Sequence, residues 1–193
     1  MAAGERAAIV GPNGAGKTTL MKLMAGQLRP RAGHIWPGGS QITRIDRRAR
    51  ARRIVVMAQS DRPDLRLRAI DHVALGRIPH RGTAHPETHG PAVVRALDTA
   101  DAAHLADRRR ASLSGGERQR LTLARALAQE RSVLLLEEPT NNLDPSARAD
   151  LMARVAGLGI IVVAVLHDLA LAPDFADRVV VMADGRVLSC APL

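Results

Sequence analysis

The chain has 193 residues, a length that fits one domain with a sizeable core. Of these residues 46% are hydrophobic, and this composition excludes a disordered chain. Its formal net charge of +9 comes almost wholly from arginine. The chain has one Trp, one Phe and no Tyr, which are too few aromatic side chains to stack on bases. We therefore expect the arginines to be solvated on helix faces and not to form a nucleic-acid surface. The single cysteine rules out an internal disulfide, and the longest apolar run, Ile160 to Leu166, is far shorter than the ~20 residues that cross a bilayer.

Apolar runs and turn residues predict an α/β fold with a parallel sheet. The apolar runs are continuous, which is typical of buried strands, and helical patterns lie between them, so both faces of the sheet should be covered. In chain order the expected elements are a strand at 7–10, a helix at 18–25, a short strand at 34–36, a basic helix at 46–53, a strand at 54–58, helices at 70–75, 92–97 and 117–128, and strands at 133–136, 160–166, 179–182 and 187–189.

The chain is expected to form a single domain, residues 1–193, that contains an inserted lobe. Residues 1–60 and 114–193 carry the predicted strands, whereas 61–113 carries two predicted helices around a stretch rich in Gly, Pro and His. We therefore interpret 61–113 as a helical lobe inserted between strands of the main sheet, and the rest as the core that binds the ligand.

A glycine-rich phosphate-binding motif stands between the first predicted strand and the first predicted helix. In order, its residues are Gly11, Pro12, Asn13, Gly14, Ala15, Gly16, Lys17 and Thr18. This is a full match to the P-loop pattern, in which glycines let backbone N–H groups point at a phosphate and the helix adds its positive end. Lys17 should reach the β- and γ-phosphates, Thr18 should hold Mg²⁺, and Thr19 should support the α-phosphate.

Two acids, Glu137 and Glu138, end the strand predicted at 133–136. The carboxyl end of a parallel strand faces the ligand crevice of an open α/β sheet. Adjacent strand residues face opposite sides, so one acid should assist the metal while the other faces the attacking water. The alternative is a pair of solvated acids at a strand end.

A second anion site is expected in the turn Leu113, Ser114, Gly115, Gly116 and Glu117, because this turn offers a hydroxyl, flexible amides and a helix start. It lies far along the chain from the P-loop. Two copies arranged head to tail would place each triphosphate between the P-loop of one copy and this turn of the other.

Over essentially its whole length the chain resembles the ATP-binding subunits of ABC transporters. The resemblance rests on six motifs: the P-loop, Gln59 after a strand, the turn at 113–117, the acidic strand at 133–138, Asn142-Leu143-Asp144, and His167-Asp168. It implies a P-loop NTPase fold and hydrolysis of ATP with Mg²⁺. The segments at 73–80 and 163–169 resemble ATPases of iron-siderophore, haem and vitamin B12 importers, which implies transport of an iron chelate or a related cargo.

The resemblance also implies roles for single residues. Glu138 resembles the general base that polarises the attacking water. Gln59 resembles the residue that touches Mg²⁺ and senses the membrane partner, with Thr18 and Glu137 as further metal ligands. His167 resembles the switch histidine that contacts the γ-phosphate, although a neutral histidine capping a strand is the alternative. Asp144 resembles a residue that crosses the dimer seam, and Ser114 and Gly116 would bind the γ-phosphate of the opposite copy.

The partners implied are an integral membrane permease, a substrate-binding protein reached through the complex, and a second copy of the chain that pairs when ATP is bound. The subunit would work as a peripheral protein on the cytoplasmic face of the inner membrane. The helical lobe is where the family docks its membrane subunit, which implies a contact region at 77–89; a plain solvated loop fits the same composition.

Three departures from the family pattern carry expectations. Position 137 is usually Asp, so Glu137 should weaken Mg²⁺ coordination and slow turnover. The P-loop begins at residue 11, whereas the family normally carries about two more strands before it and an aromatic that stacks on adenine. A true truncation would imply weaker adenine binding and an open sheet edge; the alternative is a misassigned start site. The usual C-terminal helices are also absent after Leu193. Two alternatives follow: a hydrolysis-impaired ATP-binding module, and a soluble ABC ATPase acting on ribosomes or DNA, favoured only by the basic stretch at 44–53.

Overall fold

The fold is built on one six-stranded sheet in the order β2-β3-β4-β1-β5-β6. The structure is a computed structural model and describes residues 1–193 except 59–63, 83–88, 142 and 168. The strands are β1 (Arg6–Val10), β2 (Ile54–Met57), β3 (Val133–Glu137), β4 (Ile161–Val165), β5 (Arg178–Ala183) and β6 (Arg186–Pro192). Neighbouring strands from β2 to β5 run parallel, whereas β5 and β6 are antiparallel. The α/β class with a mainly parallel sheet is therefore confirmed.

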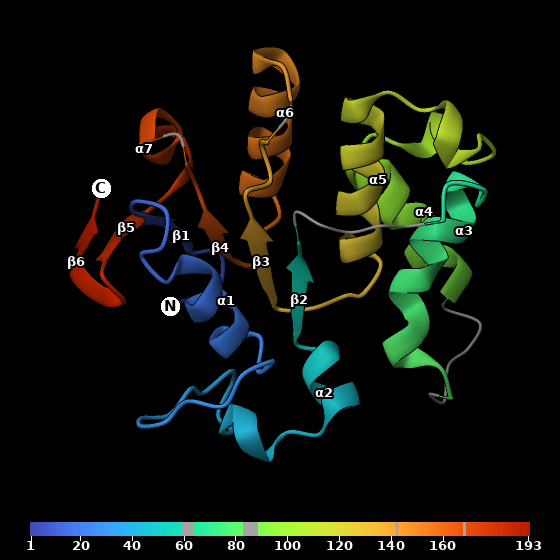
Figure 1. Ribbon diagram of the computed structural model, residues 1–193. Helices are drawn as coiled ribbons and strands as arrows, with labels where there is room; N and C mark the ends of the chain where they lie inside the picture. Colours follow the sequence, from blue (N-terminus) through green and yellow to red (C-terminus); the bar gives the residue numbers. More distant parts are fainter. Residues whose placement is uncertain (59–63, 83–88, 142, 168) are drawn as a thin grey trace.

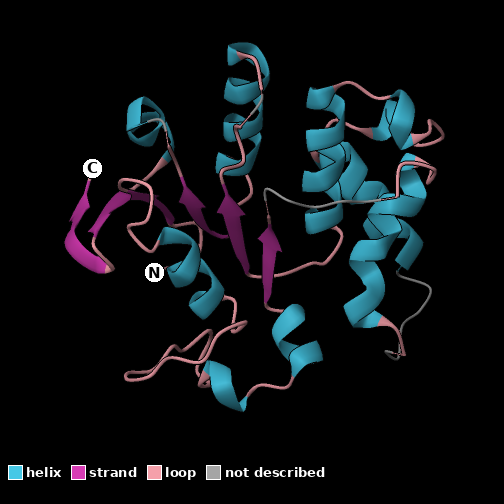
Figure 2. Ribbon diagram, viewed as in Figure 1, coloured by secondary structure: helices cyan, strands magenta, loops and turns pink. Residues whose placement is uncertain are grey.

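Seven α-helices accompany the sheet in the described parts of the chain (Figures 1 and 2). They are α1 (Lys17–Met24), α2 (Arg47–Ala51), α3 (Ala69–Ala74), α4 (His89–Thr99), α5 (Gly115–Leu127), α6 (Pro145–Ala156) and α7 (Ala172–Phe175). Figure 1 shows α3, α4 and α5 gathered beside the β2 edge of the sheet, and these three helices contact one another. Within the described residues, no helix is long and apolar enough to cross a membrane.

The sheet is buried on both faces, as its continuous apolar strands predict. Leu134 and Leu136 point into a core shared with α3 to α7, whereas Leu135, between them, points into a second core with Met21 of α1. The edge strand β6 differs, because all seven of its residues are exposed. Its turn from β5 consists of Asp184 and Gly185, both with positive φ, which suits a two-residue hairpin turn.

Two local predictions need correction. Residues 34–36 form no strand; they lie in a loop that is fastened by the N–H of Ile42, which donates to the carbonyl of Ile35 at 2.8 Å. Helix α6 is absent from the predicted elements. Its start is nevertheless marked, because Asp144 accepts a hydrogen bond from the N–H of Ala147 at 2.9 Å and Pro145 occupies the first turn.

Among the arginines that the structure describes, three are buried, contrary to the expectation of solvated helix faces. Arg77, Arg110 and Arg131 are 6%, 5% and 8% exposed. Arg77 donates to the carbonyl of Ala128 at 2.7 Å and Arg131 to that of Leu127 at 2.5 Å, so both satisfy carbonyls that the end of α5 leaves open. Arg77, the first residue of the expected contact region, thus bonds to groups of the interior, whereas 83–88 of that region lie outside the described residues.

Candidate nucleotide-binding site

The sheet order brings three sequence motifs to one edge. Strands β3, β4 and β1 are neighbours, and all three run in the same direction. The P-loop follows β1, Glu137 and Glu138 stand at the end of β3, and His167 follows β4. In the register of the sheet, Val165 lies opposite both Ile9 and Glu137, so the three strand ends are level. This is the edge at which parallel α/β sheets bind ligands.

The P-loop can take its shape only with glycine at certain positions. Gly11 has φ 149°, and a Cβ there would lie 2.1 Å from the carbonyl oxygen of Met182 on β5. Gly16 has φ 92° and caps the start of α1. These conformations are strained or closed to other residues, so the loop is held against the sheet with its backbone turned toward the crevice.

Lys17 lies beneath the P-loop. Its side chain is buried, and its Nζ donates hydrogen bonds to the carbonyls of Gly11 at 2.7 Å and Pro12 at 2.9 Å. The ammonium group is thus held within the loop by neutral acceptors. A phosphate entering the loop would offer this cation a charged acceptor, and such hydrogen bonds are stronger than those to carbonyls.

Thr18 and Glu137 meet although 119 residues separate them in the sequence. The Thr18 hydroxyl donates to Oε1 of Glu137 at 2.6 Å. A hydroxyl and a carboxylate oxygen are ligands that Mg²⁺ prefers, and here they already adjoin the P-loop, so this pair fits a magnesium ion that arrives with phosphates. The additional methylene of Glu, compared with Asp, contributes to the reach of this carboxylate across to Thr18.

Glu138 points to different partners from those of Glu137. Its φ of 50° lies in the left-handed region, which is uncommon for a residue with a side chain and is concentrated at functional sites. Its Oε1 contacts Nε2 of His167, and its Oε2 accepts a hydrogen bond from Nδ2 of Asn141 at 2.5 Å. Both carboxylate oxygens are thereby oriented at the same crevice.

Residues 114–117 and Asp144 line a second cleft of about 810 Å³, which adjoins the sheet edge because Gly115 also lies beside Glu137 and Glu138. Ser114 caps α5: its Oγ accepts from the N–H of Glu117 at 3.2 Å, while Glu117 accepts from the N–H of Ser114 at 2.7 Å. This reciprocal capping box fixes the first turn of the helix. Asp144 caps α6 across the cleft. Two helix N-termini therefore open on the same space, which favours an anion there.

The structure thus groups the predicted residues into two sites. Lys17, Thr18, Glu137, Glu138 and His167 gather at the sheet edge, with Thr19 exposed on α1 next to Thr18. Ser114, Gly115, Gly116 and Asp144 line the second cleft. Gln59, Asn142 and Asp168 lie outside the described residues.

Three residues of this region escaped the sequence analysis. Asn141 orients Glu138, Met182 closes on Gly11, and Gln119 of α5 donates to the carbonyl of Pro139 at 2.6 Å, joining the helix to the end of β3. Asn141 and Gln119 both stand close to recognised motifs, the acids at 137–138 and the turn at 113–117. The contacts of Gln119 and Met182 join segments that the sequence alone does not bring together.

Comparison with known proteins identifies the family. The family described as ABC transporter matches residues 1–141. The hemin import ATP-binding protein HmuV of Myxococcus xanthus is 43% identical, over 96% of this chain and 73% of its own length. The cobalamin import ATP-binding protein BtuD of Halobacterium salinarum is 41% identical, over 95% of this chain and 47% of its own length. The dimeric ATP-binding cassette MJ0796, bound to ADP and Pi, matches with a TM-score of 0.84 at 27% identity, over 100% of this chain and 87% of that one. The chain therefore belongs to the ABC transporter family, as one of its ATP-binding subunits.

Proposed function

We propose that the chain hydrolyses Mg-ATP to drive the import of a haem- or cobalamin-type chelate through a membrane permease. The observation that carries the hydrolytic part is the meeting of two pairs at one sheet edge: Thr18 with Glu137, and Glu138 with His167. The cargo class is supported by the hemin and cobalamin import proteins named above, which are similar over 95% or more of this chain.

In this proposal the residues at the strand ends divide the work. Lys17 exchanges its two carbonyl acceptors for the β- and γ-phosphates, and the P-loop N–H groups bind the remaining oxygens. Thr18 and Glu137 would hold Mg²⁺, which neutralises charge on the phosphates when bound. Glu138, oriented by Asn141 and His167, accepts the proton of the attacking water. Catalysis is then mainly positioning and charge stabilisation.

The second cleft needs a second copy of the chain. Ser114 and Gly116 line it together with Asp144, whereas the catalytic carboxylates stand at the sheet edge. A head-to-tail homodimer would bring this cleft onto the γ-phosphate that the P-loop of the other copy holds. The dimeric state of MJ0796 supports this arrangement.

We further propose that the permease docks at a cleft of about 580 Å³ over β2, between α2 and α5. Its lining includes Arg47, Arg50 and Arg125, so an acidic cytoplasmic segment would complement it. Docking there puts the subunit on the cytoplasmic face of the membrane as a peripheral protein, with a substrate-binding protein reached only through the complex. Charge reversal at Arg47 and Arg50 should reduce co-purification with the permease while ATP binding persists.

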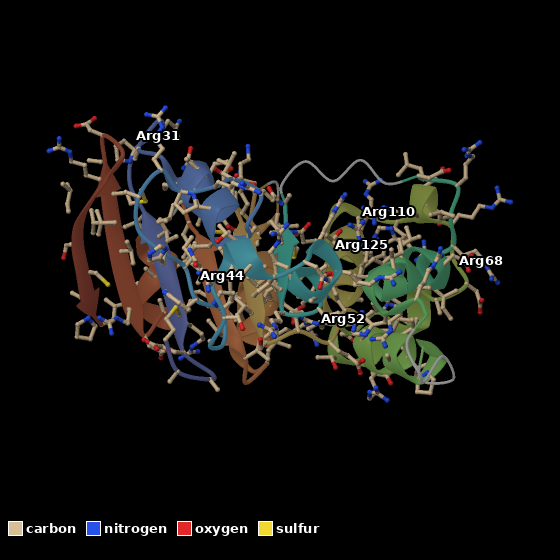
Figure 3. All side chains as sticks on the ribbon, turned by 90° about the horizontal axis from the view of Figure 1, so that it is seen from below. Arg31, Arg44, Arg52, Arg68, Arg110 and Arg125 are labelled. Carbon is tan, nitrogen blue, oxygen red and sulfur yellow. The ribbon has the colours of Figure 1, made fainter. Side chains whose placement is uncertain are left out.

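The soluble alternative, an ATPase acting on ribosomes or DNA, depends on the arginines. Those labelled in Figure 3, from Arg31 to Arg68, are spread over the length of the molecule, and Arg110 is buried. Arginines distributed in this way are typical of solvated and internally paired side chains, whereas a nucleic-acid surface needs them gathered on one face. RNA or DNA binding with a steep salt dependence would support the alternative.

The decisive experiment is steady-state phosphate release by the purified chain, with and without Mg²⁺, beside a Glu138→Gln variant. The proposal expects Mg²⁺-dependent release that falls by at least ~100-fold in the variant, because a general base contributes about that much or more. ATP binding without release in the unmodified chain would instead favour the hydrolysis-impaired module, for which Glu137 is the specific argument.

A further inference from the structure

The cleft that should receive a triphosphate contains four carboxylates, from Asp101, Glu117, Asp144 and Asp150. An unbalanced negative charge here would repel the γ-phosphate. Asp144 lies at the positive end of α6. Asp101 and Asp150 pair with two arginines of the same cleft: Arg120 Nη1 lies 3.1 Å from Asp101, and Arg154 Nη2 lies 3.0 Å from Asp150. Three of the four charges are thus offset within the cleft itself.

The charge of Glu117, the fourth carboxylate, is balanced by Arg108, which does not line the cleft. Its Oε1 accepts a hydrogen bond from Nη1 of Arg108 at 3.0 Å, while its Oε2 accepts from the N–H of Ser114 at 2.7 Å. The hydrogen bond from the Ser114 backbone, with further contributions from Ser114 Oγ and Arg108, lowers the pKa of Glu117. The carboxylate is therefore ionised at neutral pH, directly beside the serine that should meet the γ-phosphate.

Arg108 also contacts the other end of the same turn. Its Nη2 donates to the carbonyl of Ser112 at 3.0 Å. One guanidinium thus bridges a carbonyl before Ser114 and a carboxylate after it, and its planar fork fixes the distance between them. Between these two points, Leu113 is buried in the core, so the turn is held at three places.

We propose that Arg108 is a positioning residue for the Ser114–Gly116 turn, which it holds in shape while it balances the charge of Glu117 beside the incoming phosphate. Arg108 acts through the two groups that it contacts, the Glu117 carboxylate and the Ser112 carbonyl. This inference rests on the proposed function, because it concerns how the turn receives ATP bound by a second copy.

The test is ATP-dependent pairing, measured by sedimentation velocity in chains that also carry Glu138→Gln to block hydrolysis. Arg108→Ala should weaken pairing about five- to tenfold, the effect expected for one lost charge-assisted contact that is half exposed. Pairing of the Arg108→Lys variant should be intermediate between that of the parent and that of Arg108→Ala, because an ammonium group keeps the charge but cannot donate to both partners with the planar geometry of a guanidinium. Arg95→Ala is the matched control: Arg95, which lies within 61–113 like Arg108, forms a comparably short ion pair with Glu130, at 2.9 Å, away from the turn.

The coupling to Glu117 separates positioning from a general structural loss. Glu117→Gln keeps an oxygen that accepts the hydrogen bond from the Ser114 N–H but removes the negative charge. In chains that carry Glu117→Gln, Arg108→Ala should therefore weaken pairing by at most about twofold. An Arg108→Ala effect equal to that of Arg95→Ala, or equally large with Gln at 117, would overturn the proposal. If the Glu138→Gln parent itself fails to pair with ATP, the proposed function fails first, and the two failures are thereby distinguished.

Discussion

The close packing of Gly11 against β5 makes a sharp test of the P-loop geometry. In Gly11→Ala the new Cβ would lie 2.1 Å from the Met182 carbonyl oxygen, where real contacts stay beyond 3.0 Å, so loop and strand must separate by about 1 Å. The backbone at φ 149° adds a further strain of about 1–3 kcal/mol. We expect a total loss of about 3 kcal/mol or more in unfolding free energy and at least tenfold weaker ATP binding.

Gly33→Ala is the matched control for this change. Gly33 has φ 77°, so its alanine variant carries comparable backbone strain, but nothing lies within 4 Å of the added Cβ. Thermal unfolding and titration with a fluorescent ATP analogue measure both variants. Gly33→Ala should lose only about 1 kcal/mol and bind ATP normally. Equal behaviour of the two variants would refute the role assigned to the contact between Gly11 and Met182.

Two further predictions concern Glu137 and His72. Glu137→Asp shortens the side chain by about 1.5 Å and releases the Thr18 hydroxyl, so Mg-ATP hydrolysis should become several-fold faster; an unchanged rate of phosphate release would count against a weakened metal site. His72 is buried on α3, and burial, with the charges of Arg110 and Arg125, lowers its pKa from 6.5 to about 3. The unfolded chain therefore binds more protons between these values, and stability should fall by up to ~1.4 kcal/mol per pH unit as pH drops from 6.5 toward 3. Chemical unfolding at pH 7 and pH 5 should show that the unfolding free energy changes less with pH in His72→Gln than in the unmodified chain. An equal change with pH in the two proteins would contradict this prediction.

Much of the fold could be predicted because its signals are local. Strands β1 to β5 are mainly continuous apolar runs, and the P-loop is a contiguous pattern with its own glycine requirement. Helix α6 is harder to predict even though Asp144, Pro145 and Gly157 mark its ends, because Asp144 also belongs to a functional motif. The prediction of a strand at 34–36 is wrong because three residues between prolines and glycines are too short a segment to indicate a strand.

The contacts that complete the site are tertiary and could not be predicted in this way. Thr18 meets Glu137 only because β1 and β3 flank β4 in the sheet, and that order is not written in either segment. The same holds for Arg108 and Glu117, which a loop brings together. Composition does not predict buried arginines such as Arg77, because it gives the charge of the chain but not the carbonyls that a helix end leaves without a partner.

The pairing of two nucleotide-loaded copies is the most direct measure of the central claim. Chains carrying Glu138→Gln, mixed with Mg-ATP and analysed by sedimentation with nucleotide quantified in each fraction, should sediment as a dimer that retains two ATP molecules, about one per P-loop. ADP, or Ser114→Arg in the distant turn, should return them to monomers. A monomer that carries no nucleotide at any Mg-ATP concentration would contradict the account.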